Sequence, residues 1–172
     1  TYGSGRAIIN SGSKHGIDVA QAAGVSISNL KFQGNGMYSN SAWGMYFHVD
    51  QTNKSVSGVT IKNCEVSGYG REGIRFLANT GSSINDVNVS YVDTHDNRWG
   101  GLKANGKKIS AMKNYVVDHV RAWNNYGDRG NSGVTGNGIF LEGIAGARIS
   151  RCVAHNNGKD GTAPVGIWAA MG

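Results

Sequence analysis

Residues 58–76, GVTIKNCEVSGYGREGIRF, contain the pattern that decides the fold. A polar pair and a glycine-rich segment divide this stretch into three parts, and each part has two apolar residues spaced two positions apart. These pairs are Val59 and Ile61, Cys64 and Val66, and Ile74 and Phe76. Alternation over three or four residues between turn residues is typical of short β-strands and leaves no room for a helix. The stretch therefore predicts three strands joined by turns.

The same pattern recurs along the whole chain. Its third strand begins with a glycine and then an apolar anchor, at Ile17, Met45, Ile74, Leu102, Ile139 and Ile167. Successive anchors are 28, 29, 28, 37 and 28 residues apart. A nearly constant period with one longer step indicates stacked repeats with a loop insertion. We expect an all-β solenoid of about six turns of roughly 28 residues each.

The composition agrees with a solenoid built from tight turns. The 172 residues include 27 glycines and one proline, and 16% are charged. An excess of glycine without proline suits turns in which positive φ angles recur. The formal net charge of +6 favours polyanionic partners. No apolar run is long enough to span a bilayer, so we expect no membrane partner.

The repeat resembles that of the right-handed parallel β-helix proteins of the pectate-lyase-like superfamily. The V-x-I-x-N-C-x-V pattern at 59–66 and the G-I-x-F pattern at 73–76 carry this resemblance, which covers about residues 16–172. In that fold the three strands are PB2, PB3 and PB1, joined by turns T2, T3 and T1 in that order. The resemblance implies a right-handed parallel β-helix. We expect one such segment over residues 1–172, uncapped at both ends and a fragment of a longer solenoid, since a bare end exposes a sheet edge.

Two polar columns accompany the turns. At T2 the repeats carry Asn29, Asn63, Tyr91, His119 and Arg151, so the asparagine ladder typical of the superfamily stops after two turns. Three residues after PB3 they carry Asn35, Tyr69, Asn97, Asn125 and Asn157. Asparagine at four of the five positions of the second column predicts left-handed corners or side chains that cap exposed carbonyl groups.

The two cysteines occupy one inward column, three turns apart. At roughly 4.8 Å per turn, Cys64 and Cys152 are separated by about 14 Å. A disulfide requires Cα atoms within about 7 Å. We expect both thiols to be free and buried.

The chemistry depends on what PB1 presents outward. Residues between its inward anchors form columns that run along the solenoid axis. The first column is Asp18, Tyr46, Arg75, Lys103, Phe140 and Trp168, and the second is Ala20, His48, Leu77, Asn105, Glu142 and Ala170. Adjacent like charges destabilise a sheet, so Arg75 beside Lys103 indicates a role other than folding. The resemblance implies that PB1 and its flanking loops bind sugar. The alternative is an ordinary solvated face, or aromatic side chains beneath a T3 loop.

We expect an enzyme acting on an acidic polysaccharide, as a lyase or a C5-epimerase. Both reactions begin by removing the proton α to a uronate carboxylate, which requires a cation and a base. Arg75 suits the carboxylate, and Lys103, with its pKa lowered by the adjacent arginine, or His48 suits the base. Tyr46 suits the glycosidic oxygen. Candidate substrate-binding residues are Asp18, Asn105, Phe140, Glu142 and Trp168.

Two other classes stay open, so the sequence does not decide whether the protein is an enzyme. Glycoside hydrolysis needs two carboxylates about 5–9.5 Å apart. Asp18 and Glu142 are roughly 19 Å apart by strand spacing, which excludes that pair. Two other carboxylate pairs stay open, namely Asp50 with Glu72 and Glu142 with Asp128. The third class is a non-catalytic glycan-binding scaffold, such as an adhesin or a phage-spike segment.

Partners and compartment follow from the same resemblance. We expect an acidic polysaccharide partner, no nucleic acid, and a monomer or part of a larger chain that is secreted or displayed on the cell surface. The sequence assigns no metal ligands. It leaves the cofactor unknown, with calcium as the candidate cation.

Overall fold

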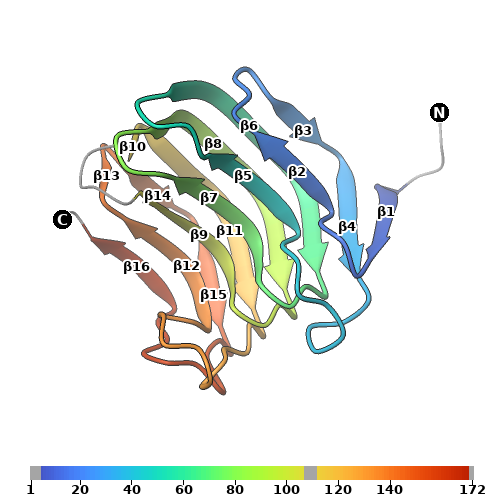
Figure 1. Ribbon diagram of the computed structural model, residues 1–172. Coiled ribbons are helices and arrows are strands. Elements are labelled where there is room, and N and C mark those ends of the chain that lie inside the picture. Colours follow the sequence, from blue (N-terminus) through green and yellow to red (C-terminus); the bar gives the residue numbers. More distant parts are fainter. Residues whose placement is uncertain (1–4, 107–111, 171–172) are drawn as a thin grey trace.

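The computed structural model describes residues 5–106 and 112–170 (Figure 1). These residues form β-strands and no helix, and the strands stack in parallel as a β-solenoid of about five turns. The all-β parallel solenoid and its 28-residue spacing are therefore confirmed. Within the described ranges, no helix is long and apolar enough to cross a membrane.

One face of the solenoid is a six-stranded parallel sheet, which we call the PB1 sheet (Figure 1). Its strands, in spatial order, are β2 (Ile17–Ala20), β5 (Met45–Val49), β7 (Glu72–Ala78), β9 (Gly100–Gly106), β12 (Asn137–Glu142) and β16 (Ile167–Ala170). Each predicted anchor pairs with the anchor one turn away, from Ile17 beside Met45 to Ile139 beside Ile167. The predicted register is correct throughout this sheet.

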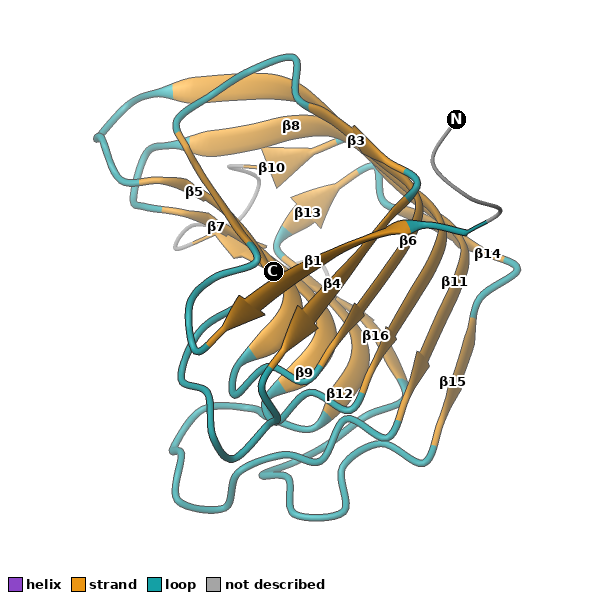
Figure 2. Cartoon of the chain, turned by 90° about the vertical axis from the view of Figure 1, so that its right-hand side faces the viewer, coloured by secondary structure: helices purple, strands orange, loops and turns teal. Residues whose placement is uncertain are grey.

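The PB2 and PB3 segments share the second sheet. Its strands are β1 (Ala7–Gly12), β3 (Ser26–Ser28), β4 (Leu30–Gly34), β6 (Ser55–Ser67), β8 (Ser83–His95), β11 (Tyr115–Trp123), β14 (Arg148–Ser150) and β15 (Val153–His155). A two-stranded sheet of β10 (Met112–Lys113) and β13 (Ile144–Ala145) completes the fold. The turned view shows the two large sheets enclosing the core, with long loops gathered at one corner (Figure 2).

The T2 corner differs from the prediction of separate strands. In β6, β8 and β11, PB2 and PB3 form one continuous strand that bends at the corner. All five residues of the T2 column have positive φ, between 50° and 58°, whatever their side chain. A single left-handed residue redirects the chain while the residues on both sides keep their pairing with the next turn. This conformation costs of order 1 kcal/mol or more for residues such as Tyr91 and Arg151, so the stacked turns impose it.

The interior is filled by columns of apolar side chains. The second PB2 position stacks Ile27, Ile61, Val89, Val117 and Ile149, each paired with its neighbour one turn away. Cys64 is fully buried and free, as predicted. Cys152 is also free, but the prediction that it is buried is wrong, since it is partly exposed in the last turn described, where one neighbouring turn packs against it.

Close backbone packing requires glycine at four of the six positions that precede the PB1 anchors. A Cβ atom on Gly16, Gly101 or Gly138 would lie 2.5 Å from the carbonyl oxygen of the next glycine in the column. On Gly44 this distance would be 2.4 Å. No side chain is compatible with these separations, so the column holds glycine and the start of every PB1 strand is aligned.

Buried asparagines line the corner between PB3 and T3. Asn97 and Asn125 are fully buried, and the Oδ1 of Asn125 accepts hydrogen bonds from the backbone and side-chain nitrogens of Asn97 at 3.3 and 3.1 Å. Asn157 does the same for Asn125 at 3.0 and 2.9 Å. Their amide groups also donate to strand carbonyls, as Asn125 does to Thr94. The predicted carbonyl caps are therefore present, although they are buried, and the left-handed residues are the preceding ones, such as Asp96.

Gly101→Ala should destabilise the protein by about 1–3 kcal/mol, because the new methyl group overlaps the backbone of the next turn. Urea denaturation measures this change in the free energy of unfolding. Gly5→Ala is the matched control, since no heavy atom lies within 4 Å of the Cβ position there. Equal stability of the two variants would show that the glycine column is not a packing requirement.

Asn125→Ala should cost at least about 1–3 kcal/mol, because it leaves buried polar groups of Asn97 and Thr94 without partners. Asn35→Ala, at the exposed start of the same column, should change stability by less than about 0.5 kcal/mol. Thermal denaturation of both variants tests the ladder, and a stable Asn125→Ala protein would contradict it.

Candidate functional site

The PB1 sheet aligns both predicted outer columns. Asp18, Tyr46, Arg75 and Lys103 are consecutive partners across β2, β5, β7 and β9. Lys103 then pairs with Phe140, and Phe140 with Trp168. The second column places His48 two residues after Tyr46, and Asn105 beside Glu142. The structure therefore brings the predicted residues onto one face, in the predicted order.

Two of these residues do not face solvent as predicted. Arg75 is 8% exposed and Phe140 is 4% exposed. The ammonium group of Lys103 lies 5.2 Å from the centre of the Phe140 ring, and Trp168 stacks on that ring at 6.0 Å. These neighbours cover Phe140, so it provides no open stacking surface for a sugar. Trp168, at 42% exposed, does.

An aromatic stack occupies the same face over β5. Trp43, which precedes the strand, stacks on Tyr46 with ring centres 4.1 Å apart, and Tyr46 stacks on His48 at 4.3 Å. The guanidinium of Arg71 lies between the rings of Trp43 and Trp99, at 4.0 and 4.6 Å from their centres. This stack fixes Tyr46 and His48 beside Arg75.

His48 is held between two carboxylates. Its Nδ1 lies 2.5 Å from an oxygen of Asp50, and its Nε2 lies 2.9 Å from an oxygen of Asp18. The carboxylates are half-exposed, with side-chain exposures of 48% for Asp18 and 52% for Asp50, whereas the imidazole is 13% exposed. The imidazole is therefore fixed, and the two acids around it are open to solvent.

Glu72 and Lys103 form the opposite edge of the site. The carboxylate of Glu72 accepts a hydrogen bond from the Trp43 indole at 2.8 Å and lies 3.8 Å from the Lys103 ammonium. Lys103 also donates to the carbonyl oxygen of Val134, in the loop before β12, at 3.0 Å. Burial lowers the pKa of Lys103, Glu72 opposes this change, and Arg75 adds to it. The predicted direction is confirmed, but burial contributes more than the adjacent arginine.

Arg75 retains unused hydrogen-bonding capacity. Its Nη1 atom is buried and has no hydrogen-bond partner among the described residues. Next to it, Tyr46 has a raised pKa, caused first by burial and then by the charge of Asp50. Tyr46 is therefore a neutral phenol at ordinary pH and suits proton donation better than proton removal.

The remaining predicted residues lie further along the second column. Asn105 donates to a carboxylate oxygen of Glu142 at 3.4 Å at the exposed surface. Asp128, considered as a partner for Glu142, instead contacts Arg98 at 3.1 Å and the Trp99 indole at 3.3 Å. Asp128 is thus already engaged in the T3 loop.

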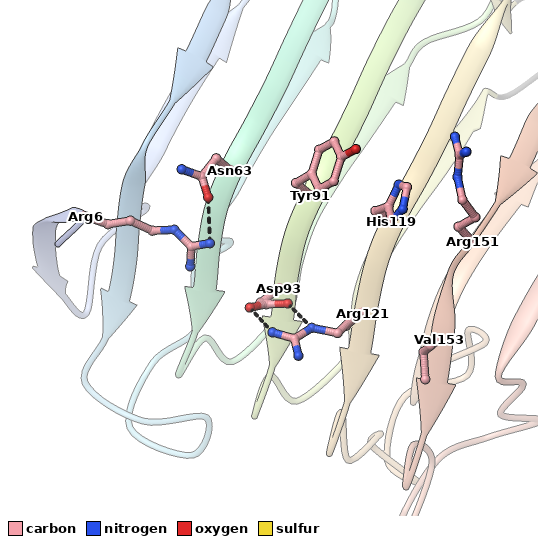
Figure 3. A pocket seen from close by; sticks show the side chains of 8 residues that line it. All are labelled: Arg6, Asn63, Tyr91, Asp93, His119, Arg121, Arg151 and Val153. Atoms are coloured by element: carbon pink, nitrogen blue, oxygen red, sulfur yellow. Dashed lines mark hydrogen bonds and ion pairs between the residues drawn. The ribbon is translucent and has the colours of Figure 1, made fainter. Parts of the chain in front are cut away.

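A cleft of about 340 Å³ lies on a different face, over T2 and PB3 (Figure 3). Its lining combines the T2 residues Asn63, Tyr91, His119 and Arg151 with Arg6, Asp93, Arg121 and Val153. The sequence places these residues in periodic outward columns but gives no sign that they enclose a cleft. Long side chains from neighbouring turns make its walls, and their directions depend on ion pairs between turns.

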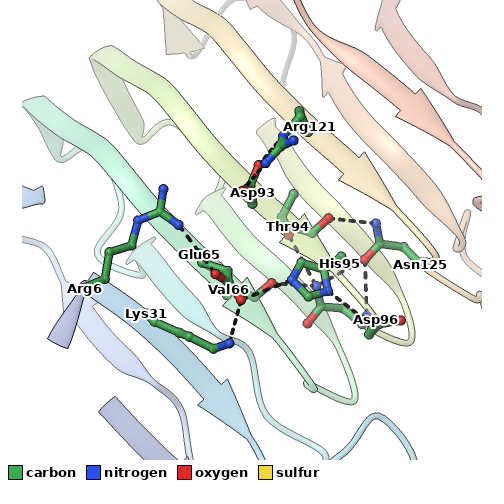
Figure 4. Close-up of polar contacts among 11 residues, drawn as sticks. Arg6, Lys31, Glu65, Val66, Asp93, Thr94, His95, Asp96, Arg121 and Asn125 are labelled. Carbon is green, nitrogen blue, oxygen red and sulfur yellow. Dashed lines mark hydrogen bonds and ion pairs between the residues drawn. The ribbon is translucent and has the colours of Figure 1, made fainter. Parts of the chain in front are cut away.

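Glu65 is the centre of a polar network beside this cleft (Figure 4). Its carboxylate lies 2.7 Å from Lys31, 3.5 Å from Arg6 and 3.4 Å from His95. Burial raises the pKa of Glu65, but the hydrogen bond and charge of Lys31 and the contact with His95 outweigh it, so the pKa is below its ordinary value. The charged form of Glu65 therefore stabilises the folded protein.

Comparisons with known proteins give no assignment. No protein-family model, no curated protein and no solved structure matches this chain. Within residues 5–106 and 112–170, no group of three or more His, Cys, Asp or Glu side chains is arranged to hold a metal ion.

Lys31→Met should reduce stability at neutral pH, and the reduction should vanish in acid. Because the pKa of Glu65 is lowered in the folded state, its contribution is present above its unfolded pKa and lost as the pH falls through the folded value. Urea denaturation at pH 7 and at about pH 3, at low salt, measures this difference. Lys62→Met, which removes an exposed cation from the same strand pair, is the control and should show no such pH dependence. A deficit that persists unchanged in acid would assign the effect of Lys31 to packing.

Proposed function

We propose that the outer face of the PB1 sheet binds an acidic, uronate-containing polysaccharide and removes the proton α to its carboxylate, as a lyase or a C5-epimerase. The observation that carries this proposal is the buried guanidinium of Arg75 with one nitrogen unpartnered among the described residues. A buried cation is costly unless it is paired, and a carboxylate is the bidentate complement of a guanidinium. A uronate carboxylate supplies that partner.

His48 is the base that fits this geometry best. Lys103 is less suitable, since its ammonium is held by Val134 and faces Glu72. Asp50 accepts a hydrogen bond from the Nδ1–H of His48, which leaves the lone pair on Nε2, facing Asp18. Asp18, which is half-exposed, turns away from Nε2 when the sugar binds and accepts hydrogen bonds from its hydroxyl groups.

Tyr46 is the proton donor. After the α proton moves to Nε2 of His48, the negative charge spreads onto the uronate carboxylate, where Arg75 stabilises it. For a lyase, the phenol of Tyr46 protonates the departing glycosidic oxygen and an unsaturated sugar results. For an epimerase, the phenol of Tyr46 instead gives its proton to the opposite face of the same carbon. Trp168, Asn105 and Glu142 extend the binding surface along the axis, whereas Phe140 supports it from below.

Glycoside hydrolysis is the second candidate, favoured by the two carboxylates around His48. One imidazole ring separates Asp18 from Asp50, with contacts of 2.9 and 2.5 Å. That arrangement suits the roughly 6.5–9.5 Å separation used by inverting glycosidases better than the roughly 5 Å separation of retaining ones. For either reaction the acidic polysaccharide substrate lies outside the cytoplasm, so we propose that the protein is secreted or displayed on the cell surface.

Arg75→Met should lower turnover of acidic polysaccharide by about a hundredfold or more, because it removes the cation while keeping most of the side-chain volume. The assay is a panel of pectate, alginate, chondroitin and a neutral glucan, with the neutral glucan inert. Unsaturated product identifies a lyase, inversion at C5 without cleavage an epimerase, and saturated reducing ends a hydrolase. Thermal denaturation confirms that the variant is folded.

Arg129→Met, which removes an exposed arginine from the T3 loop, is the matched control and should keep parental turnover. Full activity of Arg75→Met would move the active site away from the PB1 face. A parent protein inert toward every acidic polymer would instead leave the non-catalytic scaffold as the better account.

A further inference from the structure

The cleft over T2 and PB3 belongs to no part of the site described above. It lies over β6, β8, β11 and β15 of the second sheet (Figure 3). His48 and Arg75 lie on the PB1 sheet. Further hollows continue it along the axis and share its lining residues, Arg6 and Asn63 in one case and Asn63 and Tyr91 in the other. The surface is therefore an extended groove that crosses several turns.

Two arginines in the groove are rigid and yet exposed. Arg121 donates through Nε and Nη2 to the two oxygens of Asp93, both at 2.7 Å. Arg151 donates in the same way to Asp118, both at 2.9 Å. Each arginine side chain is nevertheless 61% exposed. A bidentate pair fixes the guanidinium plane and leaves the third nitrogen free to bind an anion, so these donors are organised before a ligand arrives.

Further polar groups in the groove form a row along the turns that precede Arg151 (Figure 3). Arg6 reaches across one turn to donate to the side-chain oxygen of Asn63 at 2.9 Å. Tyr91 and His119 stack at 4.5 Å, with their rings 11° from parallel. The Nδ1 of His119 contacts Asp118 at 2.9 Å, so its Nε2 points away from that carboxylate. Each turn adds one such group to the row, at the strand spacing of about 4.8 Å.

The charge of the groove favours an anion. Its walls carry five cations, namely Arg6, Lys31, Lys62, Arg121 and Arg151, against the carboxylates of Glu65, Asp93 and Asp118. The chain as a whole carries a net charge of +6, so the surrounding field has the same sign. The repetition of donors along the axis suits a linear polymer with one polar unit after another, rather than a single small anion.

We propose that this groove is a second binding surface for an extended, carboxylate-bearing polysaccharide, which lies across the turns and is held without chemistry. The identity of the polymer rests on the proposed function, since both proposals name an acidic polysaccharide. The groove itself is independent of the PB1 site, because the two lie on different sheets. Exposed, fixed arginines bind the carboxylates, and Tyr91 and His119 bind hydroxyl groups. The groove would hold the polymer while the PB1 face acts on another part of it.

The test uses Val153, which pairs with Arg121 across the sheet and is 51% exposed. Val153→Glu adds a negative charge to the groove and leaves both bidentate ion pairs in place. Val153→Gln is the matched control, with nearly the same shape and no charge. Binding to pectate and alginate is measured by retention on immobilised polymer, for variants made in the Arg75→Met background, where the PB1 site is disabled.

Val153→Glu should weaken binding of pectate about fivefold or more at low salt, because a like charge is placed against the carboxylates. Val153→Gln should bind as the Arg75→Met parent does. Arg121→Gln combined with Arg151→Gln should reduce binding further than the control pair Arg129→Gln with Arg148→Gln. Inorganic phosphate and sulfate serve as competitors, and a neutral glucan as a further ligand.

Equal binding by Val153→Glu and Val153→Gln would overturn the proposal, as would displacement of pectate by millimolar phosphate, which would indicate a simple anion site. Binding of neutral glucan as tight as that of pectate would also overturn it. The two proposals fail separately. Loss of all polymer binding in Arg75→Met would contradict the groove proposal and leave the PB1 proposal standing. Unchanged turnover in Arg75→Met would contradict the PB1 proposal and leave the groove proposal standing.

Discussion

Close backbone packing at the glycine column is the constraint on which the rest of the structure depends. At four of the glycines before the PB1 strands, the carbonyl oxygen of the next turn lies where a Cβ atom would be, for example Gly138 against Gly166. The asparagine ladder stands beside this column, with Asn125 and Asn157 bonded to the backbone on the turns before them. Together they fix both the distance and the register between turns. The outer columns of PB1 are aligned because each strand begins at the same height.

Much of this architecture is encoded locally and was predictable. A period of two within strands and of about 28 between them is enough to assign the anchors, the outward columns and the free thiol of Cys64. The course of the chain through T2 was not predictable, because Tyr91 and Arg151 adopt a left-handed backbone conformation that residues of their type normally avoid. Stacking between turns overrides that preference. The sequence repeat shows that the turns stack, but it does not show how strongly.

Exposure was the other quantity that the pattern did not give. Arg75 and Phe140 alternate outward as predicted, yet both are buried, because what covers them comes from elsewhere. Lys103 folds over Phe140, and the carbonyl group that holds Lys103 belongs to Val134, in the one long insertion of the repeat. An outward direction is a property of the strand, whereas burial depends on loops and rotamers of neighbouring turns. The same reason explains why the sequence predicted the columns of the T2 groove but not the groove.

The two faces use arginine in opposite ways, and the difference sets what each can do. Arg75 is enclosed, with one nitrogen unpartnered among the described residues, so a carboxylate that reaches it gains a strong interaction with a guanidinium shielded from solvent. Arg121 is exposed and already paired with Asp93, so an added anion gains less and exchanges readily. The first arrangement suits stabilisation of a charge that develops during a reaction, and the second suits reversible holding of a polymer. Asp93 in the groove and Lys103 on the PB1 face belong to the same turn. The regular spacing of the turns would therefore keep the groove and the PB1 face parallel to one another along the solenoid axis.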